Sequence, residues 1–474
     1  MTGSPTFQCP FCGAPISGSA PGATFACPYC QAKVVAPFAN VPITGQQAAY
    51  SGRPSWEPQQ STGPFASGVE NVAIAFDPQL GFLAIGVHAP YGQPPCLRAW
   101  DLKNKRVLWD TLQGQTWLDA HEPHVKVLGR NVYIANKRQL LCLDLANGNR
   151  KWAGALSDAV STDHSAATRG LQIADPFATP GRGAILVATI DHGLFSFDRD
   201  SGQPLWQRSF GDKAIDLQAV EYEGAVVVRV QGWTKVEIVN PAFPQPIARH
   251  GDDHWSTDLG IARLFGRTVV TVADDMGPES DQDGVLCFDA VTGRVHFFDQ
   301  IEDLEEDDVV PAVVGQRVFC ATDDLDGIYV GPYGHVMPPP IPHHHVMAFC
   351  AAGPTLAMIL KKAHGTEVRR IVGIDPNTLA FRFDAGEAGT EPDDDWDRQI
   401  VSDGYTVVYV ATPNDDDSQC ELRSLDTSTG RLLWSKRIGR WQSHRFLGGH
   451  LVVRSDEKIE VLAPPNGQVI ASLP

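Results

Sequence analysis

The chain has no stretch of about eighteen apolar residues, the length a helix needs to cross a bilayer. Its first ten residues contain neither an apolar stretch nor a basic segment, so they do not look like a secretory signal. Together these absences predict a soluble, cytoplasmic protein with no membrane partner. Disulfides between its ten cysteines would need an oxidising compartment, which this prediction excludes.

Motifs of common enzyme classes are also missing. The sequence contains no Gly-x-Ser-x-Gly elbow, no glycine-rich phosphate loop and no His-Glu-x-x-His helix. Isolated histidines such as His121, His124 and His164 are expected to have structural roles. We therefore predict no catalytic residues and a protein that is not an enzyme.

Basic residues are scarce at the start of the chain. Lys33 and Arg53 are the only ones among the first 68 residues, and phosphate binding needs several, so nucleic acid is not an expected partner. Residues 37–68 are rich in Pro, Gly, Ser and Gln, which predicts a flexible linker. The expected organisation is a small module at 1–36, this linker, and one large domain at 69–474.

Two similar segments occupy the small module. Each contains a Cys-x-x-Cys pair, Cys9 with Cys12 and Cys27 with Cys30, and 14 residues separate the two pairs. Four thiolates at this spacing satisfy tetrahedral zinc and leave no open position, so we predict one structural Zn²⁺ in a zinc ribbon. Iron in a rubredoxin-like cage is the alternative metal. Cys96, Cys142, Cys287, Cys320, Cys350 and Cys420 show no ligand spacing and are predicted to be structural.

One motif recurs through the large domain: a short apolar run, an Asp, a turn, and an aromatic residue eight positions after the Asp. We call it the Asp–aromatic motif. Six copies run from Asp101 to Trp109, Asp144 to Trp152, Asp198 to Trp206, Asp289 to Phe297, Asp375 to Phe383 and Asp426 to Trp434. Two copies are worn, one at Val236–Asn240, which has Ala248 in place of the aromatic, and one at Val461–Gly467.

The motif predicts a β-hairpin. Glycine stands four positions after the Asp in several copies, where a positive φ would close the turn with a bulge: Gly148, Gly202, Gly293, Gly430 and Gly467. The Asp side chain can accept hydrogen bonds from the turn's own amides. The aromatic residue is expected to pack against the next repeat, because a single repeat cannot bury its own apolar face.

The pattern Leu-x-x-Leu-Asp-x-x-Thr-Gly-x-x-x-Trp resembles the repeat of pyrroloquinoline-quinone-type β-propellers, over roughly 400 residues. The resemblance implies an all-β ring of four-stranded antiparallel blades. We expect eight blades, with seven as the alternative, and a degenerate unit at Val309–Gly334. It also implies that the quinone enzymes of the family use adjacent cysteines, a calcium site and an aspartate base. This chain has no Cys-Cys pair, so no quinone is expected.

Charge is predicted to separate between the two ends of the blades. Hairpin turns should bring basic residues to one face: Lys103, Lys105, Arg106, Arg150, Lys151, Arg199, Arg294 and Arg431. Acidic loops should lie on the opposite face, where a basic protein partner would bind: Asp274, Asp275, Asp323, Asp324, Asp393, Asp394, Asp395, Asp415, Asp416 and Asp417. The same loops also suit mere solvation, or calcium at residues 281–284 and 323–327.

The sequence thus favours a non-catalytic, intracellular scaffold protein. The propeller would serve as a protein-interaction platform, and the zinc ribbon on its linker would supply a second contact. The alternative is a quinone- or calcium-dependent propeller oxidoreductase.

Overall fold

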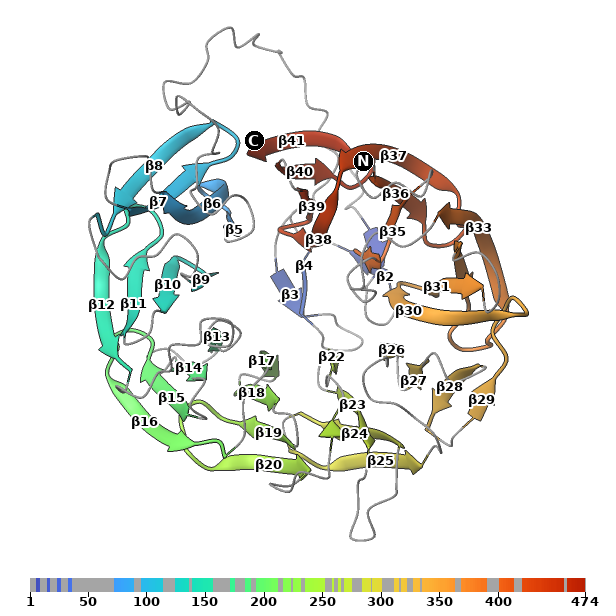
Figure 1. Ribbon diagram of the computed structural model, residues 1–474, viewed down its shortest axis with the longest axis horizontal. Coiled ribbons are helices and arrows are strands. Elements are labelled where there is room, and N and C mark those ends of the chain that lie inside the picture. Colours follow the sequence, from blue (N-terminus) through green and yellow to red (C-terminus); the bar gives the residue numbers. More distant parts are fainter. Residues whose placement is uncertain are drawn as a thin grey trace, which may run out of the picture. The chain divides into compact units, whose positions relative to one another are not determined.

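A computed structural model of the 474-residue chain was analysed (Figure 1). It describes residues 6–8, 15–17, 24–26, 33–35, 72–88, 95–113, 124–135, 139–156, 171–174, 184–188, 193–211, 216–222, 225–231, 235–251, 258–259, 263–265, 268–274, 284–290, 292–300, 311–314, 317–321, 327–332, 335–362, 368–389, 400–412, 420–455 and 458–473. All secondary structure in these ranges is β-strand, turn or bend. Within the same ranges, no helix has the length and apolar character needed to span a bilayer.

The chain divides into two compact units. Unit 1 comprises Met1–Ser55, Ala312–Val330 and Val336–Ser472, and unit 2 comprises Trp56–Pro311, Gly331–His335 and Leu473–Pro474. Each is built from antiparallel sheets whose strands pair mainly in chain order.

The described residues of unit 2 form five sheets. The first two are β5 (Ala73–Asp77), β6 (Gly81–His88), β7 (Cys96–Asp101) and β8 (Arg106–Thr111), then β9 (His124–Leu128), β10 (Asn131–Ala135), β11 (Gln139–Asp144) and β12 (Arg150–Ala155). The next two are β13 (Leu171–Ala174), β14 (Ala184–Ala188), β15 (Gly193–Asp198) and β16 (Pro204–Ser209), then β17 (Asp216–Tyr222), β18 (Ala225–Gln231), β19 (Lys235–Val239) and β20 (Pro246–Gly251). The fifth is β21 (Asp258–Leu259), β22 (Arg263–Phe265), β23 (Thr268–Asp274), β24 (Gly284–Asp289) and β25 (Val295–Gln300).

In unit 1, the part of the chain that the structure describes forms four such sheets and two short hairpins. The sheets are β26 (Ala312–Val314), β27 (Arg317–Cys320), β28 (Ile328–Gly331) and β29 (His335–Met337), then β30 (His344–Ala352), β31 (Thr355–Lys362), β32 (Arg369–Ile374) and β33 (Phe381–Gly389). They continue with β34 (Ile400–Ser402), β35 (Thr406–Ala411), β36 (Cys420–Asp426) and β37 (Leu432–Gly439), then β38 (Trp441–Leu447), β39 (His450–Ser455), β40 (Ile459–Ala463) and β41 (Gln468–Leu473). The hairpins pair β1 (Thr6–Gln8) with β2 (Pro15–Ser17) and β3 (Thr24–Ala26) with β4 (Lys33–Val35).

These sheets are the blades of an all-β propeller fold, which confirms the predicted fold class. Eight of the sheets in the described residues carry one copy of the Asp–aromatic motif each, six complete and two worn, as counted in the sequence. A further four-stranded sheet, β26–β29, is the degenerate unit predicted at Val309–Gly334. That unit therefore adds a ninth sheet to the eight that the motif marks, and the prediction had not given it a blade of its own.

Each motif forms the hairpin between the third and fourth strands of its sheet, as predicted. Where the motif has a glycine, that residue has a positive φ, for example 70° at Gly148 and 69° at Gly202. The strand register shifts before the Asp, as between Cys142 and Leu143. The Asp caps its own turn: Asp198 Oδ1 accepts hydrogen bonds from the amides of Asp200 (3.1 Å) and Ser201 (2.8 Å). The bulge and the cap fix each turn in one conformation.

The cores form between neighbouring sheets. In unit 2, one cluster combines Leu83, Ile85 and Leu97 of the first sheet with Val132, Leu141 and other residues of the second, all buried. In unit 1, a similar cluster joins the last two sheets through Val408, Trp434 and Leu451. Each sheet therefore buries its apolar face against the next, as the repeat predicts.

Candidate functional site

The first feature of the candidate site is a set of turns held together on one end of the blades. The turn between the first two strands of a sheet and the turn between its last two are joined by a backbone hydrogen bond. Leu102 N donates to Phe82 O (3.0 Å), and Leu145 N donates to Arg130 O (3.0 Å). These hydrogen bonds place the two kinds of turn at the same end of each of these sheets. We call this end of each unit its turn face.

The carboxylates of the motif accept hydrogen bonds from backbone amides of their own turns. Asp101, which is buried, accepts hydrogen bonds from the amides of Lys103 (3.1 Å) and Asn104 (3.0 Å). Partial burial works to raise the pKa of Asp144, but the Ala146 amide and the Lys151 ammonium outweigh it and lower that pKa. Both carboxylates are therefore bound within their own turns.

The basic side chains of the same turns, unlike the carboxylates, are exposed to solvent. Six basic side chains from the first two sheets of unit 2 are exposed, and we call them the basic row: Lys103, Lys105, Arg106, Arg130, Arg150 and Lys151. Arg106 lies 3.5 Å from Asp101 and remains 67% exposed, and Lys151 Nζ lies 3.1 Å from Asp144. Five of the six were predicted on this face, and Arg130 was missed because it lies outside the motif.

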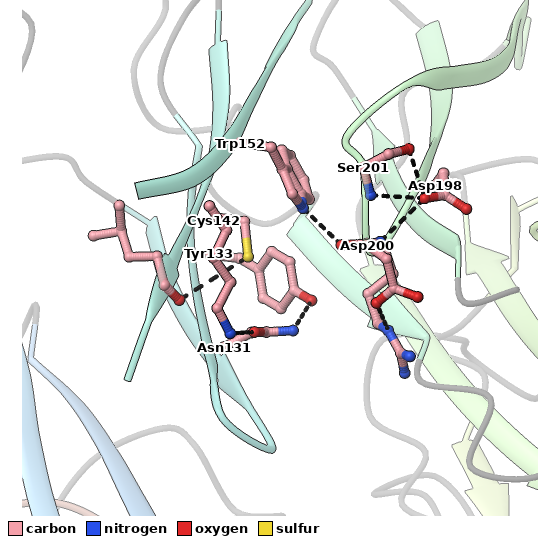
Figure 2. A network of polar contacts seen from close by, with 10 residues as sticks. Asn131, Tyr133, Cys142, Trp152, Asp198, Asp200 and Ser201 are labelled. Carbon is pink, nitrogen blue, oxygen red and sulfur yellow. Dashed lines mark hydrogen bonds and ion pairs between the residues drawn. The ribbon is translucent and has the colours of Figure 1, made fainter. Parts of the chain in front are cut away.

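Tryptophan side chains fix the turns of adjacent sheets against each other. Trp109 of β8 donates its indole N–H to Leu145 O (2.8 Å), and a Cβ on Gly148 would lie only 2.7 Å from the Trp109 ring. Figure 2 shows the equivalent contact one sheet later, where Trp152 reaches from β12 toward the turn after Asp198. Its indole N–H donates to the carbonyl of Arg199 (2.7 Å).

The polar network at this seam extends to the basic row. Lys151 Nζ donates to Asn131 Oδ1 (2.6 Å). Asn131 Nδ2 donates in turn to the Tyr133 hydroxyl (2.9 Å), as Figure 2 shows. Tyr133 is fully buried and packs against Trp152, with ring centroids 6.0 Å apart. Lys151 is therefore held in place by groups anchored in the core.

The other predicted sites lie largely outside the described residues. Cys9 and Cys12 fall between β1 and β2, and Cys27 and Cys30 fall between β3 and β4, so the predicted zinc ribbon remains untested. Of the acidic loop residues, Asp274 is placed as the last residue of β23, at the opposite end of its sheet from the turn at Asp289. The side chains of Asp274, Asp275, Asp323, Asp324, Asp393, Asp394, Asp395, Asp415, Asp416 and Asp417 are not described.

The described cysteines are free thiols, in agreement with their predicted structural role. Burial raises the pKa of Cys96 and of Cys142 to about 11, and that of Cys287 and of Cys350 to about 12. A thiol with so high a pKa carries almost no thiolate at neutral pH and is a poor nucleophile or metal ligand. Among the described residues, no group of three or more His, Cys, Asp or Glu side chains is placed to hold a metal ion.

Glu237 and His444 are two of the buried polar side chains, among the described residues, that the sequence did not predict. Glu237 of β19 has no exposed surface and pairs with Arg208 of the preceding sheet and with Arg249 Nη2 (2.7 Å). His444 of β38 accepts a hydrogen bond at Nδ1 from Trp441 Nε1 (3.0 Å), and burial lowers its pKa to about 4. Their strands show no alternation that marks either residue, because β19 is buried throughout and the buried residues Trp441 and His444 of β38 are three positions apart.

Comparison with known proteins gives a partial match to one family. Residues 95–242 match the model described as "Outer membrane protein assembly factor BamB", which covers less than a third of the chain. The matched segment contains all six residues of the basic row. No curated protein sequence matches the chain.

Solved structures share the fold at low identity. A eukaryotic initiation factor is 9% identical and has a TM-score of 0.52, with 82% of this chain and 97% of that chain covered. BamB from Moraxella catarrhalis is 12% identical with a TM-score of 0.44, covering 82% and 94% of the two chains. Apo AztD from Citrobacter koseri is 13% identical with a TM-score of 0.43, covering 72% and 93%. At these identities the likeness concerns the fold alone.

Proposed function

We propose that this protein is a non-catalytic platform that binds other proteins, with the turn face of unit 2 as one of its contact surfaces. The observation that carries the proposal is the basic row. Six exposed cations stand on turns, or at the start of the strands that follow them, where the backbone is fixed by caps, bulges and hydrogen bonds between turns. A surface prepared in this way loses little conformational entropy when a partner binds.

Further support comes from the chemistry of the described side chains. The buried thiols have raised pKa values, and the buried imidazole of His444 stays neutral down to about pH 4. These groups serve packing rather than nucleophilic or acid–base catalysis. The family matched by residues 95–242 is described as an assembly factor, which agrees with a role in contacting proteins.

The remaining parts of the proposal extend beyond this face. The four N-terminal cysteines would hold one structural zinc in a second contact module, and the acidic loops would offer a surface for basic partners. The protein would work in the cytoplasm. Joining two contact modules on one chain raises the effective concentration of the second once the first has bound.

Site-specific photo-crosslinking tests the platform role. A photoreactive residue would replace Asn149, an exposed turn residue beside the basic row, in the full-length protein in its own cells. A matched control would carry the same group at Gln207, an exposed residue of β16 away from the turn. We expect a discrete protein adduct from position 149 and none from position 207. Equal labelling at both positions, or quinone-dependent dehydrogenase activity of the purified protein, would overturn the proposal.

A further inference from the structure

We propose that the basic row docks an acidic segment of a partner polypeptide, a run of Asp and Glu side chains lying across the first two sheets of unit 2. This inference rests on the platform function and names the chemistry of the partner at that face.

The local charge at the basic row is positive, whereas the net charge of the chain is negative. The protein as a whole carries a net charge of −18, yet the segments 101–106, 129–131 and 144–151 present six exposed cations. Their two carboxylates, Asp101 and Asp144, are tied to turn amides and are buried or half-buried. Because salt screens charges over about 10 Å, a ligand at this face meets mainly the local cations.

Lys105 supplies a second, independent observation. It stands four positions after Asp101, where five other turns have glycine, and its φ is 51°. Leu379 occupies the same place in the sheet β30–β33 with φ 61°, but there the side chain packs on a hydrophobic cluster. Lys105 is exposed, so no packing compensates its unfavourable backbone. Uncompensated strain of this kind marks positions kept for function.

The basic row is also continuous and rigid across the seam between the sheets. Trp109 locks the outer strand of the first sheet onto the turn of the second through its bond to Leu145. Lys151 is anchored by Asn131, and Arg130 lies on the turn bonded to Leu145. Cations from both sheets are therefore presented as one surface to a single extended ligand.

A polypeptide fits this surface better than nucleic acid or a membrane. Duplex DNA carries a charge about every 1.7 Å and extends far beyond a surface of six cations, where it would meet the strongly negative remainder of the protein. An anionic membrane covers a still wider area. A short acidic segment can neutralise the basic row and end at its borders.

The test measures binding of a fluorescein-labelled peptide of twelve glutamates to the full-length protein by fluorescence anisotropy. Three variants are compared with the wild type: Lys105→Gly, the double variant Lys103→Glu/Arg150→Glu, and Arg431→Glu as a matched control. Arg431 is an exposed turn residue of unit 1 outside the basic row, in the same position relative to its glycine as Arg294 and Asn149.

We expect Lys105→Gly to weaken binding by about 3- to 5-fold while the midpoint of thermal unfolding stays the same or rises by about 1–2 °C. The double charge reversal is expected to weaken binding by at least about 30-fold, and Arg431→Glu by less than about 2-fold. Equal losses in all three variants, or none, would overturn the inference.

Competition identifies the source of negative charge. A 20-base-pair DNA duplex and vesicles with phosphatidylserine are titrated against the bound peptide at 150 mM salt. Displacement by either one at lower charge concentration than unlabelled peptide would contradict a polypeptide partner. Crosslinking at Asn149 distinguishes the two proposals. If a discrete partner is captured there but the glutamate peptide does not bind, the platform function is supported and the acidic character of the partner is contradicted.

Discussion

The indole nitrogens of Trp109, Trp152, Trp206 and Trp434 all donate to carbonyls of a neighbouring turn. The acceptors are Leu145, Arg199, Pro241 and Pro464, at 2.6 to 2.8 Å. The eight-residue spacing from Asp predicted an aromatic residue that packs on the next repeat, and this is confirmed. The acceptor carbonyl was not predictable, because it belongs to a segment 30 to 47 residues away whose position depends on the packing of two sheets.

At the residue scale, His444 should make unit 1 sensitive to acid. Trp441 donates to Nδ1, so Nδ1 must stay unprotonated, and burial lowers the His444 pKa from 6.5 to about 4. Since the folded pKa lies below the unfolded one, the stability due to neutral His444 is complete above pH 6.5. It is lost as the pH falls from 6.5 toward 4, by up to about 3 kcal/mol.

The variant His444→Gln tests this expectation, because its amide can accept from Trp441 and donate to Val408 without titrating. Thermal unfolding of wild type and variant would be followed from pH 8 to pH 4. We expect the gap between their midpoints to narrow steadily as the pH falls. His450→Gln, at a half-buried position in the same sheet, is the matched control. Parallel pH curves for wild type and His444→Gln would contradict the assignment.

Glu237 shows why some buried groups lie beyond sequence analysis. The strand Lys235–Val239 is buried throughout, and nothing in its pattern marks one residue as an ion-pair partner. Arg208 comes from the previous sheet and Arg249 from the next strand. Glu237 lies 29 residues from Arg208 and 12 from Arg249, so the three side chains meet only after both sheets are packed together.

At the scale of the element, the glycine of each hairpin has two separate tasks. Gly202 has φ +69°, and a Cβ there would also lie 2.3 Å from the Trp152 ring. Gly81 has φ +82° with no atom within 4 Å of the position of its missing Cβ. Substitution of Gly81 therefore tests backbone strain alone, whereas substitution of Gly202 tests backbone strain together with the contact between sheets.

We expect Gly81→Ala to lower the free energy of unfolding by about 1 kcal/mol through backbone strain alone. Gly202→Ala adds a clash with the indole and should cost about 3 kcal/mol. Urea unfolding followed by tryptophan fluorescence measures both changes, and the spectrum of folded Gly202→Ala should shift as Trp152 is displaced. Equal costs for the two variants would show that the ring moves aside freely.

Much of the hairpin was predictable because its determinants are local. Asp, the glycine four residues later and the aromatic residue act within nine positions, and the structure reproduces the turn, the bulge and the cap. The degenerate unit lacks these residues, so its status as a separate sheet was decided by packing. There, Phe319 and Ile328 join Phe349 and Leu356 of the following sheet.

At the scale of the whole molecule, the zinc and the absence of a quinone remain to be measured. Native mass spectrometry of the full-length protein, purified from its own cells without chelator, tests both. We expect one zinc with loss of four thiol protons. Ser replacing Cys9 and Cys12 should abolish the zinc, whereas Cys142→Ser should not alter it. A quinone mass, or calcium that survives desalting, would instead support the propeller oxidoreductase.

The hairpins that begin at Asp144, Asp198 and Asp426 carry both halves of a contact: the aromatic residue that reaches the following sheet and the glycine turn that receives the aromatic residue of the preceding one. Trp152 lies on the turn of Gly202, and the turn of Gly148 receives Trp109. A gene segment encoding one such sheet would, on duplication, bring a compatible surface for each neighbour. The number of sheets can therefore increase without a new kind of interface. A copy of the motif can also lose its aromatic residue while contacts with the neighbouring sheets keep it folded, as in the copy where Ala248 packs on Gly293.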